Sequence, residues 1–204
     1  MGTFFKSTWF RCISVLFLIA VIAGGLLAIL NDLLYVSAEE KTSRAIKKIY
    51  GKTMTYSVEL DVDSDDETIN KPIIYDNVGE IEKIYVIGDK DSESYDRLFK
   101  TKGYKGYKNG TIALWIKVTY NRDNKTIEKV ILEDNTKQTL MSKLTGSFYD
   151  GFLVDKTEEY EQGKLFTADV NDNDNIKNPV TGATYSATAA CNSVNCVLLY
   201  VWGN

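Results

Sequence analysis

The residues best suited to chemistry lie at 180–186, where the sequence reads VTGATYS. These small and hydroxyl-bearing residues stand directly before an apolar pattern that predicts a helix. The start of a helix presents unpaired backbone N–H groups and the positive end of the helix dipole, so this stretch is suited to holding a phosphate group. Threonine and serine at a helix start also serve as plain N-caps. From the residues alone, the capping interpretation is favoured and the phosphate site is the alternative.

The composition of the chain excludes several classes of catalytic and metal site. The chain has 204 residues, no histidine and 3 cysteines, which excludes imidazole general bases, Ser-His-Asp or Cys-His nucleophile pairs, and a four-thiolate cluster within one chain. A net charge of −4 argues against nucleic acid as a partner. We assign no metal ligands, because the acidic loop at 63–72 lacks the spaced glycine and terminal glutamate of an EF-hand. Any redox chemistry must therefore come from a cofactor held by other residue types.

The elements that position 180–186 are those of a small α+β domain. Alternating or β-branched runs predict strands at 55–62, 80–88, 110–120 and 126–134, the last two forming a hairpin with a loop of about five residues. Helices are expected at 37–51, early in 91–110, and at about 137–152. We predict a small twisted antiparallel sheet with flanking helices.

The final helix has a single apolar face. Its small and apolar residues recur at helical spacing: Ala187, Ala190, Val194, Val197, Leu198 and Val201. Small side chains dominate its first turns, so we expect the start of this helix to lie close to the sheet.

The N-terminus carries a second distinctive feature, an uncharged run at 12–31. A helix of about 20 apolar residues spans roughly 30 Å, the thickness of the hydrocarbon core. We predict a transmembrane helix at 12–34; the alternative is a cleaved signal peptide, whose apolar region is shorter. Lys6 and Arg11 precede the run, which places residues 1–11 in the cytoplasm and the domain at 35–204 on the outer face of the cell membrane.

The segment NPVTGATYS at 178–186 resembles the flavinylation motif of the FMN-binding domain family, Asp-x-x-Ser/Thr-Gly-Ala-Thr. This family includes flavin-carrying components of the Rnf electron-transport complex and of the sodium-translocating NADH:quinone reductase. The resemblance extends to GYKGY at 103–107, to the hairpin that follows it, and to the closing helix ATAACNSVNCVLLY at 187–200. The Rnf members of the family likewise combine one N-terminal membrane span with an exported domain of this size.

The resemblance implies a cofactor and its site. In the family, the last threonine of the motif carries FMN through a phosphoester bond that a flavin transferase installs from FAD. The match places the covalent FMN on Thr184, preceded by Thr181, Gly182 and Ala183. Tyr185 and Leu140 are expected near the flavin, and Met141 and Tyr104 are further candidates for ring contacts.

The sequence departs from the family pattern at two places. Asn178 stands where the family has aspartate, although Asp172 and Asp174 lie nearby as other sources of negative charge. The stretch at 136–141, TKQTLM, stands where the family carries Glu-Thr-Pro-Gly-Leu-Gly, and Leu140 alone is retained.

These observations lead to three hypotheses. The first is an electron-transfer subunit with covalent FMN in a membrane-bound, ion-translocating ferredoxin:NAD+ oxidoreductase of the Rnf type, whose partners are the other membrane subunits and, during maturation, the flavin transferase. The second is a subunit of a sodium-translocating NADH:quinone reductase or a free-standing extracellular flavoprotein. The third, motivated by Asn178 and the altered 136–141 stretch, is an anchored structural or binding domain without flavin.

Overall fold

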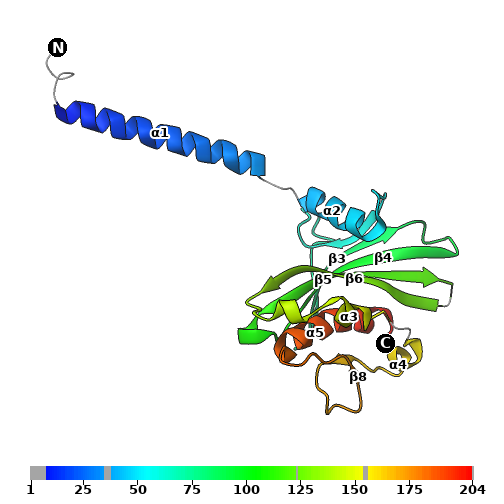
Figure 1. Ribbon diagram of the computed structural model, residues 1–204. Helices are drawn as coiled ribbons and strands as arrows, with labels where there is room; N and C mark the ends of the chain where they lie inside the picture. Colours follow the sequence, from blue (N-terminus) through cyan, green and yellow to red (C-terminus); the bar gives the residue numbers. More distant parts are fainter. Residues whose placement is uncertain (1–7, 35–37, 123, 154–155, 204) are drawn as a thin grey trace. The chain divides into compact units, whose positions relative to one another are not determined.

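The computed structural model describes residues 8–34, 38–122, 124–153 and 156–203. The chain divides into two compact units, Met1–Ser43 and Arg44–Asn204. The second unit contains the whole β-sheet and the predicted chemical site (Figure 1).

The first unit contains α1 (Thr8–Leu34) and the start of α2 (Ala38–Tyr50). Within the described ranges, none of the helices combines the length and the apolar character needed to cross a membrane. The transmembrane part of our fold prediction is therefore without support from the structure.

The α+β prediction itself is confirmed. The strands are β1 (Ser57–Asp61), β2 (Ile73–Tyr75), β3 (Gly79–Ile87), β4 (Ser94–Gly103), β5 (Thr111–Asn121), β6 (Asn124–Thr136), β7 (Phe166–Thr167) and β8 (Ile176–Lys177). The helices of this unit, besides the end of α2, are η2 (Tyr107–Asn109), η3 (Met141–Lys143), α3 (Gly146–Asp150), α4 (Thr157–Glu161) and α5 (Thr184–Val201).

The main sheet is antiparallel, in the order β1-β3-β4-β5-β6, with β2 paired to β3 as well. The short β7 and β8 form a separate parallel pair. One face of the main sheet packs on α5, and the other packs on the last turns of α2 through Ala45, Ile46 and Ile49 (Figure 1). Because both faces are covered, neighbouring strand residues such as Leu98 and Phe99 are both fully buried.

The segment at 91–110 is where the sequence prediction of a helix is wrong. Residues 94–103 form β4, which pairs with β3 on one side and with β5 on the other. A strand in the middle of a sheet that is covered on both faces lacks a clean apolar-polar alternation. Without that alternation, the local pattern of β4 does not distinguish a strand from a short helix.

Two further expectations need correction. The helix expected at about 137–152 is instead a 3₁₀ turn, η3, followed by the five-residue α3. The β5–β6 connection is tighter than a five-residue loop, because the ladder extends to the pair Asn121 and Asn124. The helix expected at 37–51 is confirmed from Ala38 onward, with Gly51 beyond its end at a φ of +73°; Ser37, its expected cap, lies outside the described residues.

The helix α5 lies close to the sheet, as its small residues predict. All six residues of its predicted apolar face are buried. Opposite them stands Gly103 at the end of β4, where an added Cβ would overlap the carbonyl oxygen of Ala189 and the backbone nitrogen of Ser193. Backbone-to-backbone contact at this point fixes the distance of α5 from β4.

Candidate functional site

The stretch at 180–186 forms the entry into α5. Ala183 occupies the N-cap position, and the amide of Ala187 donates the first bond of the helix to the Ala183 carbonyl at 2.9 Å. Because the N-cap position is Ala183, which has no side-chain acceptor, the helix start has no side-chain cap. Neither Thr184 nor Ser186 therefore acts as the plain N-cap of α5. By helix geometry, the amides of the first turn have no carbonyl four residues back within the helix. The plain-capping interpretation is therefore not seen at the start of α5, and the anion-binding interpretation stays a prediction.

A pocket of about 530 Å³ opens beside this helix start. Four threonines line it: Thr181 and Thr184 from the motif, Thr188 one turn further along α5, and Thr167 at the end of β7. The opposite wall is the segment at 167–170, and Pro179 and Val180 complete the lining. The volume lies within the range of roughly 300–1,000 Å³ found for sites that take small molecules and cofactors.

The wall at 167–170 is held in place by a buried amide. Asn195 of α5 accepts a hydrogen bond from the Phe166 amide at 2.8 Å and donates one to the Phe166 carbonyl at 2.9 Å. Asn195 thereby acts toward β7 as a neighbouring strand would, and it ties the segment that follows β7 to the middle of α5. The pocket walls are therefore fixed relative to each other by buried hydrogen bonds.

Gly182 gives the motif its turn. Its φ is +75°, a left-handed conformation that glycine adopts without steric cost. An added Cβ would lie 2.6 Å from the Nζ atom of Lys143, which donates a long hydrogen bond of 3.4 Å to the Thr181 carbonyl. The absence of a side chain at 182 therefore leaves room for the Lys143 ammonium group beside the motif.

Gln138 ties the start of α5 to the end of the β-hairpin. Its side-chain oxygen accepts hydrogen bonds from the Ser186 hydroxyl at 2.9 Å and from the Tyr107 amide at 3.2 Å, and its nitrogen donates to the Thr136 carbonyl at 3.0 Å. Ser186 is buried, so this polar contact fixes the first turn of α5 from the side that faces the sheet.

Asn178 forms structural hydrogen bonds through both its side-chain amide and its backbone. Its Nδ2 donates to the Phe148 carbonyl at 3.1 Å, and its backbone N–H donates to the Thr167 carbonyl at 2.8 Å. Asp172 accepts hydrogen bonds from the side chain of Asn175 and from the Asp174 and Asn175 amides, which hold its pKa below the ordinary value. In the described structure, Asp172 is thus engaged within its own loop.

The structure brings some of the predicted site residues together. Thr181 and Thr184 share the pocket wall, and Ala183, which is buried, and Gly182 connect them. Within the described ranges, Tyr185, Leu140, Met141 and Tyr104 do not line this pocket.

Those four residues lie in other surroundings. Tyr185 is exposed, with its ring centroid 6.4 Å from that of Tyr107. Burial, followed by interaction with Glu80, raises the pKa of Tyr104 to about 12. Leu140 is exposed, and Met141 packs against the main core.

Several residues of the site escaped sequence reasoning. Thr188 could have been found, because a residue four positions after Thr184 falls on the same side of a helix. Asp169 and Val170 of the pocket wall, and Lys143 and Gln138, come from other parts of the chain, and no local pattern marks them. Among the residues described, no cluster of three or more metal-binding side chains is present.

Comparison with known proteins gives no further assignment. No family model, no curated protein and no solved structure matches the chain.

Proposed function

We propose that this protein is an electron-transfer flavoprotein that carries FMN covalently on Thr184. One observation carries the proposal: the exposed Thr184 stands in the uncapped first turn of α5, on the wall of a cofactor-sized pocket. The chemistry of the lining supports a fit, since it combines hydroxyls, first-turn amides and the apolar side chains of Val170, Pro179 and Val180.

In this proposal Thr184 acts as an attachment point. Its oxygen forms a bond to the flavin-side phosphorus of FAD, the bond between the two phosphates breaks, AMP leaves, and the hydroxyl proton passes to solvent or to the flavin transferase. The first-turn amides of α5 would hold the phosphate, because the helix dipole favours negative charge there. When bound, FMN supplies the electron transfer, and the protein supplies its position.

The proposed setting is a membrane-bound, ion-translocating ferredoxin:NAD+ oxidoreductase of the Rnf type. The support is the resemblance of 178–186 to the flavinylation motif together with the uncharged run at 12–31, which we propose associates the protein with the cell membrane, the domain lying on the outer face. The partners would be the other membrane subunits. A role in a quinone-reducing complex or as a free-standing extracellular flavoprotein is the alternative, and co-purification of subunits from native membranes would separate these settings.

A flavin-less structural domain is the second candidate function. It is favoured by Asn178, which replaces the aspartate of the family motif and is engaged in a structural hydrogen bond. Intact-mass analysis of the protein from cells with an active flavin transferase separates the two, because only the flavoprotein gains the mass of FMN.

The Thr184→Val variant tests the attachment site. We expect it to lose the fluorescent flavin band that survives denaturing electrophoresis, because valine keeps the shape of threonine without the hydroxyl. Thr188→Val is the matched control, since it removes a hydroxyl from the same pocket one helical turn away, and it should retain the band. A band that persists in Thr184→Val would contradict the assignment.

A further inference from the structure

Lys143, whose ammonium group lies beside the motif, has no role in the function proposed so far. Lys143 ends η3, next to Leu144, which is buried and anchors the turn in the core. Its side chain runs back from this turn to the Thr181–Gly182 segment, 38 residues further along the chain. A lysine from a distant element therefore places its ammonium group against the turn that leads into Thr184.

The contact leaves the ammonium group with donors to spare. A lysine ammonium has three N–H donors, and charge-assisted hydrogen bonds are normally about 2.7–2.9 Å long. The bond to the Thr181 carbonyl is 3.4 Å long, so it occupies one donor weakly. Gly182, which has no Cβ, leaves the space that the Nζ atom occupies.

The pocket lining carries a negative charge, which would act against a phosphate bound to Thr184 unless a cation lies nearby. Asp169 is the charged residue of the pocket lining, and its carboxylate accepts a hydrogen bond from the Asn171 amide at 2.9 Å. A phosphate joined to Thr184 would be a diester with one negative charge, and it would be repelled by Asp169. A nearby ammonium group offsets this repulsion.

We propose that Lys143 is a positioning residue that stabilises the phosphate carried on Thr184, with Gly182 keeping the path between them open. This inference rests on the proposed function. Lys143 contributes at two stages, when the phosphate approaches Thr184 and when the diester is in place.

Lys143→Met tests the proposal, because methionine keeps most of the length of the side chain without its charge. The full-length protein is incubated with FAD and flavin transferase, and the FMN adduct is followed by intact mass. We expect the initial rate of adduct formation to fall about twofold to fivefold at low salt, the effect of one exposed ion pair, and to differ less at high salt. Lys143→Arg should restore most of the rate.

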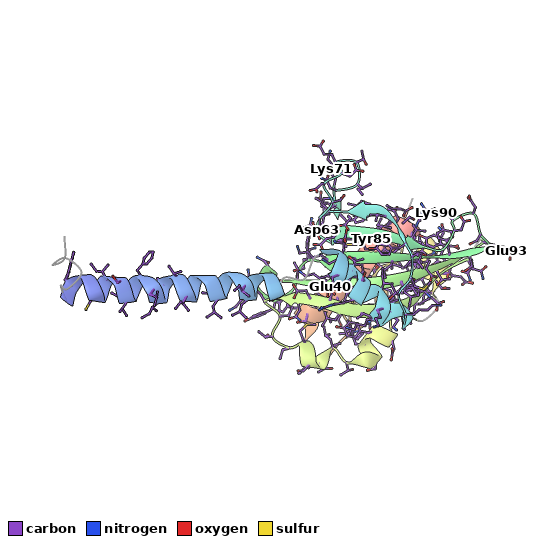
Figure 2. All side chains as sticks on the ribbon, turned by 90° about the horizontal axis from the view of Figure 1, so that it is seen from above. Glu40, Asp63, Lys71, Tyr85, Lys90 and Glu93 are labelled. Carbon is purple, nitrogen blue, oxygen red and sulfur yellow. The ribbon has the colours of Figure 1, made fainter. Side chains whose placement is uncertain are left out.

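The second readout is the ³¹P resonance of the completed adduct. Lys143→Met should shift it from the wild-type position, because the phosphate loses a neighbouring charge and its hydrogen-bond donor. Lys71→Met is the control: Lys71 is exposed in the loop before β2, on the opposite side of the molecule from the short α3 and α4 helices (Figure 2), and its removal should change neither rate nor resonance.

The outcomes separate the two proposals. A wild-type adduct whose rate and ³¹P resonance are unchanged in Lys143→Met would overturn the role of Lys143 and leave the flavin assignment intact. A rate that falls while the resonance stays fixed would also overturn it, because the lysine would then act through contact with the transferase. A wild-type protein that acquires no adduct would overturn the proposed function, and the role of Lys143 with it.

Discussion

At the scale of single residues, Asn178 shows how a departure from a family motif acquires a structural reason. The amide Nδ2 donates to the Phe148 carbonyl, a contact that an ionised carboxylate cannot make because it has acceptors alone. Asparagine at this position therefore holds the segment before the motif against α3. The same contact gives the departure from aspartate at this position a structural reason.

Asn178→Asp should destabilise the protein. The change loses a donor and turns a carboxylate oxygen toward a carbonyl oxygen, which costs about 1–3 kcal/mol when the groups are partly buried. Urea unfolding of the full-length protein, followed by tryptophan fluorescence, measures the loss. Asn173→Asp is the matched control on the other side of β8: Asn173 accepts a hydrogen bond from Lys177, so a carboxylate there should leave stability unchanged or raise it slightly. Equal losses in both variants would contradict this account.

At the scale of elements, α5 organises both the core and the site. Its middle packs directly on β4 at Gly103, Asn195 ties it to β7, and its first turn opens into the pocket. The position of Thr184 is thus set by contacts well beyond the motif. A change that moves α5 should disturb the pocket even where it leaves every motif residue in place.

Gly103→Ala should be strongly destabilising, by about 3 kcal/mol or more, because its Cβ would overlap the backbone of α5, which cannot yield as a flexible side chain does. The same urea unfolding measurement gives the loss. If the variant folds, the proposed attachment of FMN to Thr184 predicts that its flavin content also falls, since the start of α5 would shift.

Gly146→Ala provides the matched glycine control. Gly146 is the first residue of α3, and an added Cβ there would meet nothing within 4 Å. Alanine has the higher helix propensity, so this variant should be neutral or more stable by up to about 1 kcal/mol. A Gly103→Ala protein as stable as Gly146→Ala would rule out close helix–sheet contact as the constraint on this position.

At the scale of the whole domain, the covered sheet carries an ion cluster at one edge, centred on the buried Lys83. Lys83 of β3 is buried and pairs with Asp61 at 2.8 Å and with Asp63 at 2.7 Å, while the Tyr85 hydroxyl donates to Asp61 at 2.6 Å (Figure 2 labels Asp63 and Tyr85). The cluster joins β1 and the loop after it to β3. Such a cluster makes the stability of the domain depend on pH.

Acidification should weaken the domain through Asp61. Burial by itself raises the pKa of this carboxyl group, but the hydrogen bonds from Lys83 and Tyr85 outweigh it and hold the pKa below its ordinary value of 3.8. A carboxyl group whose pKa is lower in the folded state stabilises the fold above its unfolded pKa and loses that contribution as the pH falls through the folded value. The free energy of unfolding should therefore fall below about pH 4, and urea unfolding between about pH 7 and about pH 2.5 measures the decrease.

The Lys83→Met variant tests whether the ion cluster around Lys83 is the source of the pH dependence of stability. The variant should be less stable at neutral pH, by about 1–3 kcal/mol, and its stability should depend less on pH in the acid range. Lys90→Met is the control: Lys90 pairs with Glu59 from a half-exposed position, and its loss should cost under about 1 kcal/mol and leave the acid slope unchanged. An unchanged slope in Lys83→Met would assign the acid sensitivity to other carboxyl groups.

The sequence by itself determined those features that depend on local pattern. The α+β class, the strands at β1, β3, β5 and β6, and the buried face of α5 follow from periodicity, because a strand or helix with one covered face repeats its apolar residues at a fixed spacing. The hydroxyl- and glycine-rich stretch before α5 was likewise visible, and its suitability for a phosphate stays a prediction.

The tertiary structure alone decided what surrounds that stretch. The strand β4 was missed because both of its faces are covered, which removes the alternation that marks a strand. Three groups reach the start of α5 from segments 14 to 46 residues away from Thr184 in the chain: the pocket wall at 167–170, the amide of Gln138 and the ammonium group of Lys143. Local sequence patterns do not predict contacts between segments so far apart. Packing of α5 on the sheet brings them to the residues around Thr184, and the local sequence does not specify that packing.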